Sequence, residues 1–288
     1  CTFTNSQRGI LTIIDDTIPD GPQNFAFVTV GGLTPANFTL DDDSDVALSN
    51  TRIYTNVIPG TFTVTQNAPP PGFALSNLVC TDPDNGTTVN LATFAATIDL
   101  DGGESITCTF TNSQRGTITI IEDTIPDGPQ NFAFTATGLT PTNFSLDDDA
   151  DATISNTRVY SNTSPGTYTV TQNAPAGFAL TSLVCTDPDN GTTVNLATRA
   201  ASIDLDAGES ITCTFTNTQR GTITIIDDTI PDGPQNFAFT ATGLTPTNFV
   251  LDDDADATLS NTRTYTNVLP GSYTVTQNAP PLFTLTNL

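Results

Sequence analysis

Five cysteines are the residues of this 288-residue chain with the most recognisable chemistry. Cys80 precedes Cys108 by the same interval as Cys185 precedes Cys213, and Cys1 stands apart at the first position. Thiols at a regular spacing in strand-rich sequence favour disulfides, so we predict the pairs Cys80–Cys108 and Cys185–Cys213. Buried reduced thiols and metal thiolates are the alternatives. Because disulfides persist in oxidising surroundings, the pairing predicts an extracellular or cell-surface location.

Runs of aspartate are the second feature with chemical potential. Carboxylate oxygens at alternate positions are the ligands that Ca²⁺ prefers, so these runs are candidate calcium sites near a domain junction. The candidate ligands are Asp41, Asp43, Asp45, Asp147, Asp149, Asp151, Asp252, Asp254 and Asp256. No glutamate closes the run in the way an EF-hand requires. The alternative is a solvated acidic loop that keeps an extracellular fibre soluble.

Three arginines recur at matching positions between strand segments, at Arg8, Arg115 and Arg220. All seven basic residues of the chain are arginines, so these three are a large share of its positive charge. We expect them to make interdomain contacts, with the acidic loops of the adjoining unit as partners. The alternative is an exposed arginine that contributes less than about 1 kcal/mol.

The composition excludes several classes of function. The formal net charge of -24 disfavours nucleic acid and anionic membrane surfaces as partners, and no apolar run approaches the length of a membrane span. Without Lys and His the chain lacks a Schiff-base amine and an imidazole base. We therefore predict a non-enzymatic protein with no catalytic residues and no cofactor, calcium being the single candidate ligand.

The chain repeats itself with a period of roughly a hundred residues, the size of an autonomous domain. We expect residues 1–8 to be the last strand and linker of a preceding repeat. The repeats that follow are 9–115, 116–220 and 221–288, the third incomplete. We therefore expect the chain to be a segment of a longer array. The alternative is that separate subunits join head to tail, with residues 1–8 of one subunit completing the third repeat of its neighbour. Short linkers predict a semi-rigid array.

Within a repeat the apolar residues alternate with polar ones, which is the pattern of β-strands. Ile118 and Ile120 alternate with threonines, and Ile211, Cys213 and Phe215 share one face of the closing strand. Gly, Pro, Asn and Asp clusters separate these runs, and no helical period is sustained. The sequence predicts an all-β fold of tandem antiparallel β-sandwiches, with one disulfide in each.

Residues 166–180 have the sequence Gly-Thr-Tyr-Thr-Val-Thr-Gln-Asn-Ala-Pro-Ala-Gly-Phe-Ala-Leu. Similar sequences occur at residues 60–75 and 271–285. This segment resembles the signature of prealbumin-like domains of the SpaA and Cna-B type in bacterial surface proteins and pilins. The resemblance extends over nearly the whole chain. It implies a β-sandwich used as a rigid module in surface stalks, adhesins and fibres.

The chain departs from that family at one chemically decisive site. Many such domains are locked by an isopeptide bond between a first-strand lysine and a last-strand asparagine, promoted by an acid. Here the asparagines are present, whereas carboxylates occupy the lysine position and glutamines the acid position. The residues are Asn5, Asn112 and Asn217; Asp15, Glu122 and Asp227; and Gln66, Gln172 and Gln277. Without lysine the bond cannot form, so we expect the disulfide to take over the crosslinking role.

Together these features predict a structural repeat protein that forms an extracellular filament or a cell-surface stalk. Near-identical repeats present near-identical surfaces, which favours self-association into a fibre and contacts between neighbouring repeats. An adhesin that carries a ligand-binding surface on its repeats, stiffened by calcium, is the alternative.

Overall fold

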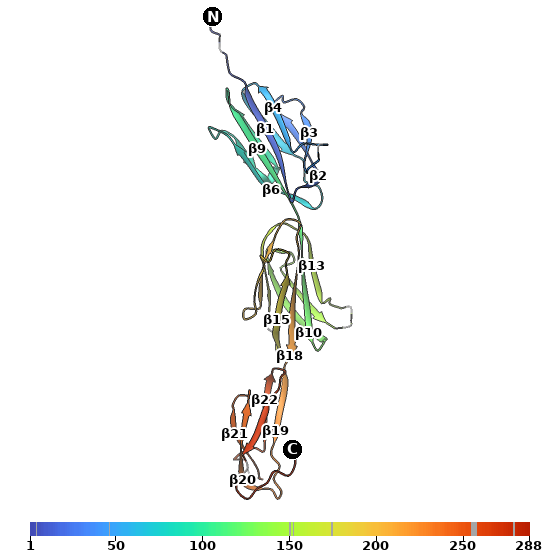
Figure 1. Cartoon of the computed structure of the whole chain (residues 1–288), viewed down its shortest axis with the longest axis vertical. Coiled ribbons are helices and arrows are strands. Elements are labelled where there is room, and N and C mark those ends of the chain that lie inside the picture. The colour runs from blue at the N-terminus through green and yellow to red at the C-terminus, as the bar shows by residue number, and fades with distance from the viewer. Residues whose placement is uncertain are drawn as a thin grey trace.

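The computed structural model describes residues 1–3, 5–45, 47–149, 151, 153–173, 175–254, 258–278 and 280–288. Its strands form three bodies that follow one another along the long axis of the molecule (Figure 1). We call these bodies the first unit (β1 to β9), the second unit (β10 to β18) and the third unit (β19 to β23). The arrangement agrees with the predicted tandem array.

The first unit is a sandwich of two sheets. One sheet has the order β4-β1-β9-β6 and the other the order β3-β2-β5-β8-β7. The four-stranded sheet consists of β1 (Gly9–Ile18), β4 (Thr51–Val57), β6 (Phe73–Thr81) and β9 (Ser105–Gln114). The five-stranded sheet consists of β2 (Gly21–Val30), β3 (Asn37–Asp42), β5 (Gly60–Gln66), β7 (Thr88–Asn90) and β8 (Ala95–Leu100). A 3-10 turn at Leu91–Thr93 leads from β7 into β8.

The second unit repeats this topology. Its sheets have the orders β13-β10-β18-β15 and β12-β11-β14-β17-β16. The strands are β10 (Gly116–Ile125), β11 (Gly128–Thr137), β12 (Asn143–Asp148), β13 (Thr157–Thr163), β14 (Gly166–Gln172), β15 (Phe178–Thr186), β16 (Thr193–Asn195), β17 (Ala200–Leu205) and β18 (Ser210–Gln219).

The third unit contains two smaller sheets, β19-β22 and β21-β20-β23. The strands are β19 (Gly221–Ile226), β20 (Gly233–Thr242), β21 (Asn248–Asp253), β22 (Thr262–Val268) and β23 (Thr274–Asn278). Its buried residues form two small clusters around Phe237 and Tyr265 rather than one continuous core. Among the described residues β19 pairs with β22 alone, so Ile223 and Ile225 are only partly buried, whereas their counterparts in β1 are fully enclosed.

Alternating side chains build each core. In β1, Leu11 and Ile13 are fully buried between the sheets, and Thr12 between them is only partly buried. Phe27 of the opposite sheet packs edge to face against Phe110 of β9 at a centroid distance of 5.1 Å, a favourable geometry for aromatic rings. The period-two pattern therefore places the apolar face of both sheets in the sandwich interior, and the predicted all-β sandwich is confirmed.

One strand pair departs from the antiparallel arrangement that we expected. The first strand β1 lies beside the last strand β9 and runs parallel to it, in register from Ile10↔Ser105 to Ile18↔Ser113. The pair β10 and β18 repeats this arrangement. The physical reason is the route of the chain, which enters a unit at one end and leaves it at the other (Figure 1). Its first and last strands must therefore point in the same direction.

Candidate functional site

Each of the first two units contains one disulfide, as predicted. Cys80 of β6 and Cys108 of β9 stand directly opposite each other in the antiparallel pair, with a Cα–Cα distance of 4.0 Å. Cys185 and Cys213 occupy the same positions in β15 and β18. Cys108 and Cys213 are fully buried, so these bonds are part of the core. Cys1 is a free, exposed cysteine.

A buried cluster of one acid and two amides connects the two sheets of the first unit. Asn112 of β9 donates through Nδ2 to Asp15 Oδ1 at 2.7 Å, and Gln66 of β5 donates through Nε2 to Asn112 Oδ1 at 2.7 Å. All three side chains are at most 1% exposed. Burial raises the pKa of Asp15 to about 7, although hydrogen bonds from Asn112 and Thr17 oppose the shift. The side chains that stand at the isopeptide positions are thus in contact.

The second unit holds the same cluster with a longer acid. Asn217 donates to Glu122 Oε1 at 2.7 Å and Gln172 donates to Glu122 Oε2 at 2.8 Å. Arg199 then donates to Gln172 Oε1 at 3.3 Å. Burial raises the pKa of Glu122 to about 8, and the hydrogen bonds from Asn217, Thr124 and Gln172 act in the opposite direction. In this unit the glutamine donates to the acid itself, whereas in the first unit Gln66 donates to Asn112.

In the third unit Gln277 donates to Asp227 Oδ1 at 3.0 Å. Burial raises the pKa of Asp227, and the nearby charge of Asp253 adds to the shift. The acid is 5% exposed. Asn5, the remaining asparagine of the predicted set, is exposed and lies in the segment that precedes β1.

Two of the predicted junction arginines, Arg115 and Arg220, lie between consecutive units, and Arg8 precedes the first unit. Arg115 occupies the one position between β9 and β10; its Nε donates to the carbonyl of Phe73 in the first unit at 3.3 Å. Its Nη1 donates to the carbonyl of Asn162 at 3.1 Å and to Ser164 Oγ at 2.9 Å in the second unit. The acceptors are carbonyls and a hydroxyl, not the carboxylates of the acidic loops that we expected.

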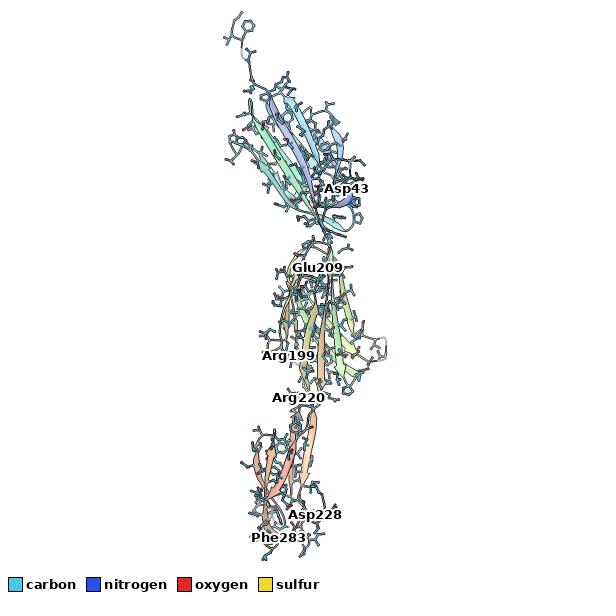
Figure 2. All side chains as sticks on the ribbon, in the orientation of Figure 1. Asp43, Arg199, Glu209, Arg220, Asp228 and Phe283 are labelled. Atoms are coloured by element: carbon cyan, nitrogen blue, oxygen red, sulfur yellow. A yellow bond between two sulfur atoms is a disulfide. The ribbon has the colours of Figure 1, made fainter. Side chains whose placement is uncertain are left out.

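Arg220 repeats this geometry at the next junction, where Figure 2 shows it between the second and third bodies. It donates to the carbonyl of Phe178 at 3.4 Å and to that of Asn267 at 3.0 Å. Arg8 donates to the carbonyl of Asn56 at 2.9 Å. Gln114 adds a main-chain hydrogen bond at the first junction: its carbonyl accepts from Gly208 N–H of the second unit at 3.0 Å.

The aspartates predicted as calcium ligands lie at the end of β3 and of its counterparts and in the loops that follow. Asp41 and Asp147 are buried, Asp43 and Asp149 are half-buried, and Asp45 and Asp151 are exposed. Burial raises the pKa of Asp41, and the charges of Asp43, Asp45 and Asp42 add to it. In the third unit Asp252 is buried and Asp254 half-buried, and Asp256 lies outside the described residues. Calcium at these residues stays a prediction.

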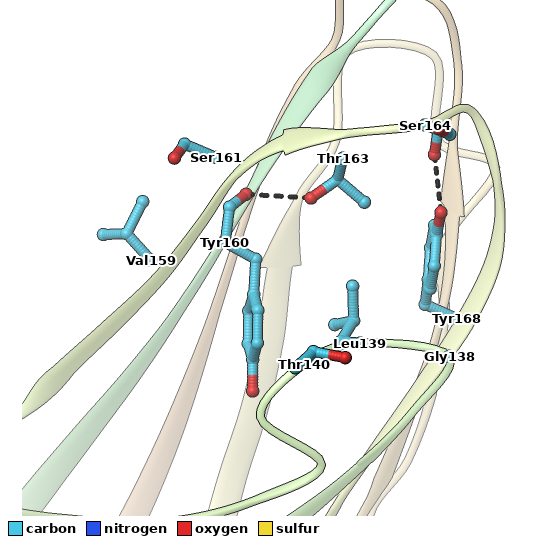
Figure 3. Close-up of a pocket in the computed structure, with 9 residues that line it drawn as sticks. All are labelled: Gly138, Leu139, Thr140, Val159, Tyr160, Ser161, Thr163, Ser164 and Tyr168. Carbon is cyan, nitrogen blue, oxygen red and sulfur yellow. Dashed lines mark hydrogen bonds between the residues drawn. The ribbon is translucent and has the colours of Figure 1, made fainter. Parts of the chain in front are cut away.

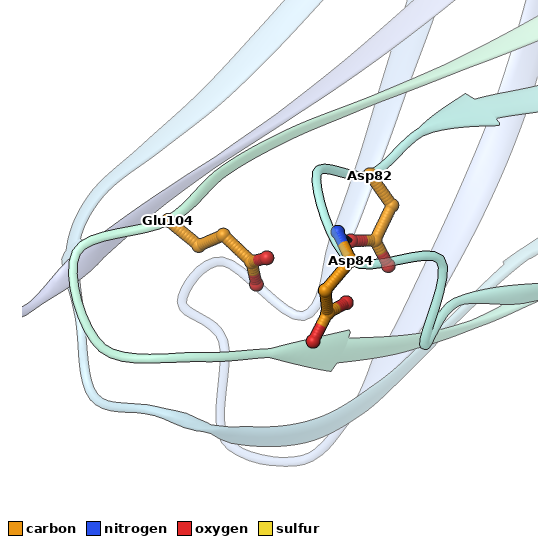
Figure 4. Close-up of side chains that lie close together, drawn as sticks. All are labelled: Asp82, Asp84 and Glu104. Atoms are coloured by element: carbon orange, nitrogen blue, oxygen red, sulfur yellow. Dashed lines mark hydrogen bonds between the residues drawn. The ribbon is translucent and has the colours of Figure 1, made fainter.

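The carboxylates that converge in the described part of the chain are different ones. Asp82, Asp84 and Glu104 place oxygens within 4.8 Å of one another (Figure 4), and Asp187, Asp189 and Glu209 do the same in the second unit. Asp82 and Asp84 belong to the Asp-Pro-Asp-Asn-Gly turn, and Glu104 lies in the turn between β8 and β9, which are strands of different sheets. The turn was recognisable in the sequence, whereas its approach to the glutamate depends on the tertiary fold.

A shallow surface hollow of about 410 Å³ lies beside the junction end of the second unit (Figure 3). Tyr160 and Tyr168 line it, and Tyr168 donates through its hydroxyl to the carbonyl of Ser164 at 2.6 Å. The rest of its lining is Gly138, Leu139, Thr140, Val159, Ser161 and Thr163. None of these described lining residues carries a carboxylate.

A family model for a prealbumin-like fold domain matches residues 11–114 and again residues 118–219. The chain belongs to this prealbumin-like family. The match covers most of the first and second units, and the resemblance deduced from the sequence is confirmed. No curated protein matches the chain significantly. Among the described residues none lies in a helix long and apolar enough to cross a membrane.

Several solved structures resemble this prealbumin-like chain at low identity. The Bacillus anthracis TIE protein is 14% identical with a TM-score of 0.30, over 96% of this chain and 46% of its own. The pilus adhesin SpaC from Lactobacillus rhamnosus GG, in its open conformation, is 12% identical with a TM-score of 0.30, over 96% of this chain and 37% of its own. A point mutant of the major pilin from Streptococcus pyogenes is 14% identical with a TM-score of 0.25, over 75% of this chain and 99% of its own. This chain spans less than half the length of the first two proteins, and these likenesses extend to the general fold alone.

Proposed function

We propose that this chain is a structural spacer, a row of prealbumin-like domains that carries tension in an extracellular stalk or filament. The observation that carries the proposal is the parallel pairing of the first and last strands in each complete unit. A pull on the two ends of the chain drags β1 and β9 in opposite directions along their shared ladder. All of the inter-strand hydrogen bonds are then strained together in shear, rather than opened one at a time as in a hairpin.

The junctions support the same role. A single residue separates β9 from β10, and β18 is followed by Arg220 and then directly by β19. Arg115 donates to carbonyls on both sides of its junction. Linkers this short leave little freedom for one unit to swing against the next. We propose the repeat boundaries 9–115, 116–220 and 221–288, with Arg8, Arg115 and Arg220 as interdomain contacts.

The disulfides support an extracellular or cell-surface location, because such bonds persist in oxidising compartments. The proposed partners are the neighbouring repeats and further copies of the chain, and the charge of -24 argues against nucleic acid. We propose no enzymatic activity: the carboxylates Asp15 and Glu122 are fully buried and engaged by amides inside the core.

Force spectroscopy on the full chain, held by its two ends, tests the proposal. We expect two similar unfolding events, one from each complete unit, at forces well above those that open a strand pair by unzipping. The matched control attaches the handles so that the first unit is pulled across β6 and β9, an antiparallel pair, after its disulfide is removed. Equal rupture forces in both directions would contradict a shear-resisting spacer.

A further inference from the structure

The outer surface of the four-stranded sheet consists of threonine, isoleucine and valine, in a chain that carries 31 acidic side chains. In the first unit two rows of side chains cross all four strands on this surface. The rows are Ile53, Thr12, Thr107 and Thr81, and Thr51, Ile14, Thr109 and Val79. The alternate residues Leu11, Ile13 and Cys108 lie in the core, so the two rows face outward.

The second unit repeats this surface position by position. Its rows are Val159, Thr119, Thr212 and Thr186, and Thr157, Ile121, Thr214 and Val184. We call the two rows of each unit its threonine face. In the third unit the strands β19 and β22 carry the corresponding residues, with Thr224 beside Thr264 and Ile226 beside Thr262. All of these side chains are uncharged.

The threonine face leaves large apolar side chains in water. Ile53 of β4 and Val79 of β6 are 55% and 51% exposed, at opposite edges of the first face. Val159 and Val184 occupy the same positions in the second unit and are 52% and 58% exposed. Covering these groups would remove them from water, which favours association through this face.

The carboxylate in the next row of the sheet is already bound. Asp16 Oδ2 accepts from Thr111 Oγ1 at 3.0 Å, and Asp123 Oδ2 accepts from Thr216 Oγ1 at 3.0 Å in the second unit. Two copies of a chain with a net charge of -24 repel each other wherever carboxylates meet. The threonine face is therefore a surface through which two copies can approach at low electrostatic cost.

The threonine faces of consecutive units follow one another on one side of the chain. Arg115 is the one residue between β9 and β10, so the alternation of side chains continues from Thr109 to Thr119 without a change of side. Arg220 joins β18 to β19 in the same way. In Figure 1 the four-stranded sheets of the first and second units are both turned toward the viewer. A partner with the same repeat can cover these faces together, and a second copy of the chain has that repeat.

The size of the face decides how many units must take part. Strands lie about 4.8 Å apart and rise about 3.3 Å per residue, so a four-stranded face about seven residues long covers roughly 450 Å². A specific protein interface buries about 800 Å² on each partner. One face falls short of this area, whereas the faces of two consecutive units together reach it.

We propose that the threonine faces of the first and second units bind the same faces of a second copy of this chain, sheet against sheet. The proposal rests on the filament role proposed above, which brings copies of the chain side by side, and it assigns the surface of their lateral contact. Packed sheets lie about 10 Å apart, a distance at which Thr, Ile and Val side chains interdigitate. Val79 and Val184 lie inside this contact.

Sedimentation equilibrium of the full chain tests the proposal, with Cys1→Ser in every protein because the exposed thiol of Cys1 could itself link two copies. We expect a monomer–dimer equilibrium that shifts toward the dimer when NaCl is raised from about 0.05 M to about 0.5 M. Salt screens the repulsion between two acidic chains and leaves the apolar contact in place. A chain that stays monomeric at every protein and salt concentration would overturn the proposal.

A matched pair of variants locates the contact. Val79→Glu/Val184→Glu adds one carboxylate to each face at positions that are open to solvent in the single chain, so the fold is kept. Burial of these charges should raise the dimer Kd by about tenfold or more. The control Val89→Glu/Val194→Glu makes the same change in β7 and β16 of the other sheet, at valines that are 46% and 44% exposed, and should dimerise as the parent does.

Equal loss of dimer in both variants would overturn the proposal, because added negative charge alone would then account for it. So would loss in the control alone, which would place the contact at the edge of the five-stranded sheet. The pulling experiment on a single chain separates this contact from the tension-bearing role, since Val79→Glu/Val184→Glu should rupture at the force of the parent. A monomeric parent chain would remove the lateral contact alone, and equal rupture forces in the two pulling directions would remove the spacer role alone.

Discussion

Asn112 donates a 2.7 Å hydrogen bond to Asp15, and this bond joins the last strand of the first unit to its first strand. Asn112 is in register with Thr17, two positions after Asp15, so the two side chains share one face of the parallel pair, where both are completely buried. In many prealbumin-like domains an isopeptide bond joins the first and last strands at this place. Here the tie between the first and last strands is a hydrogen bond to an acid, and the covalent bond is the disulfide that joins β9 to β6 on its other side.

The buried acids predict an unusual dependence of stability on pH. The pKa of Asp15 rises from 3.8 to about 7 on folding and that of Glu122 from 4.5 to about 8. The folded state therefore binds these protons more tightly than the unfolded state. Their contribution to stability is complete below about pH 4 and is lost as the pH rises towards 7 and 8. Thermal unfolding followed by circular dichroism should give a higher Tm at pH 5 than at pH 8.5.

The matched variant for this prediction is Asp15→Asn/Glu122→Gln, which keeps the shape of both side chains and cannot ionise. Its Tm should depend less on pH over the same interval. In the parent chain the two acids should contribute a pH-dependent part of the free energy of unfolding on the order of a few kcal/mol, and the variant lacks it. General charge repulsion among the surface carboxylates also changes with pH, but it is common to both proteins. Identical pH profiles for parent and variant would show that these acids do not titrate as the burial indicates.

The disulfides predict a second stability effect. Each closes a loop with a sequence separation of 28 residues, and closing a loop of this size stabilises a domain by about 3 to 4 kcal/mol. The variant Cys80→Ser/Cys108→Ser should lower the free energy of unfolding of the first unit by about that amount and leave the second unit unchanged. Denaturant unfolding with a probe in each unit measures both values. Equal loss in the two units would mean that they do not unfold independently.

Much of this fold could be predicted because local pattern and burial agree. The alternation of Ile211, Cys213 and Phe215 predicts a strand with one buried face, and all three side chains are at most 1% exposed. The cysteines could be paired because each of the first two units contains one pair. The junction position of Arg115 follows from its place between two strand patterns.

Other features depend on tertiary structure and could not be read from the pattern. A period of two does not give the direction of a strand, so the parallel pairing of β1 with β9 was not foreseen. The partners of Arg115 include carbonyls whose positions are set by segments 42 and 47 residues away. The approach of Glu104 to Asp82 and Asp84 joins two loops whose sequences contain no sign of each other.

The junction arginine predicts a change in shape with little change in stability. Arg115→Ala removes hydrogen bonds to Phe73 in the first unit and to Asn162 and Ser164 in the second. The hydrogen bonds are at least partly exposed, so unfolding of either unit should change by less than about 1 kcal/mol. Small-angle scattering should show a broader distribution of distances between the units. Arg8→Ala is the control, because Arg8 donates to Asn56 and precedes the first unit instead of lying between two units of this chain.

The position of the disulfides predicts how far each unit extends under force. A pull on the termini acts on β1 and β9, whereas the disulfide ties β6 to β9, so it does not prevent β1 from sliding away. After rupture the 28-residue separation between Cys80 and Cys108 stays closed, and the rest of the unit unravels by roughly 25 nm. Reduction should add about 10 nm to each event in both complete units, because the closed loop then extends at up to about 3.5 Å per residue. The rupture force itself should change little, since the β1 and β9 ladder is the same in both states. A large drop in force on reduction would mean instead that the ladder between β6 and β9 carries the tension, and that the disulfide is the mechanical crosslink.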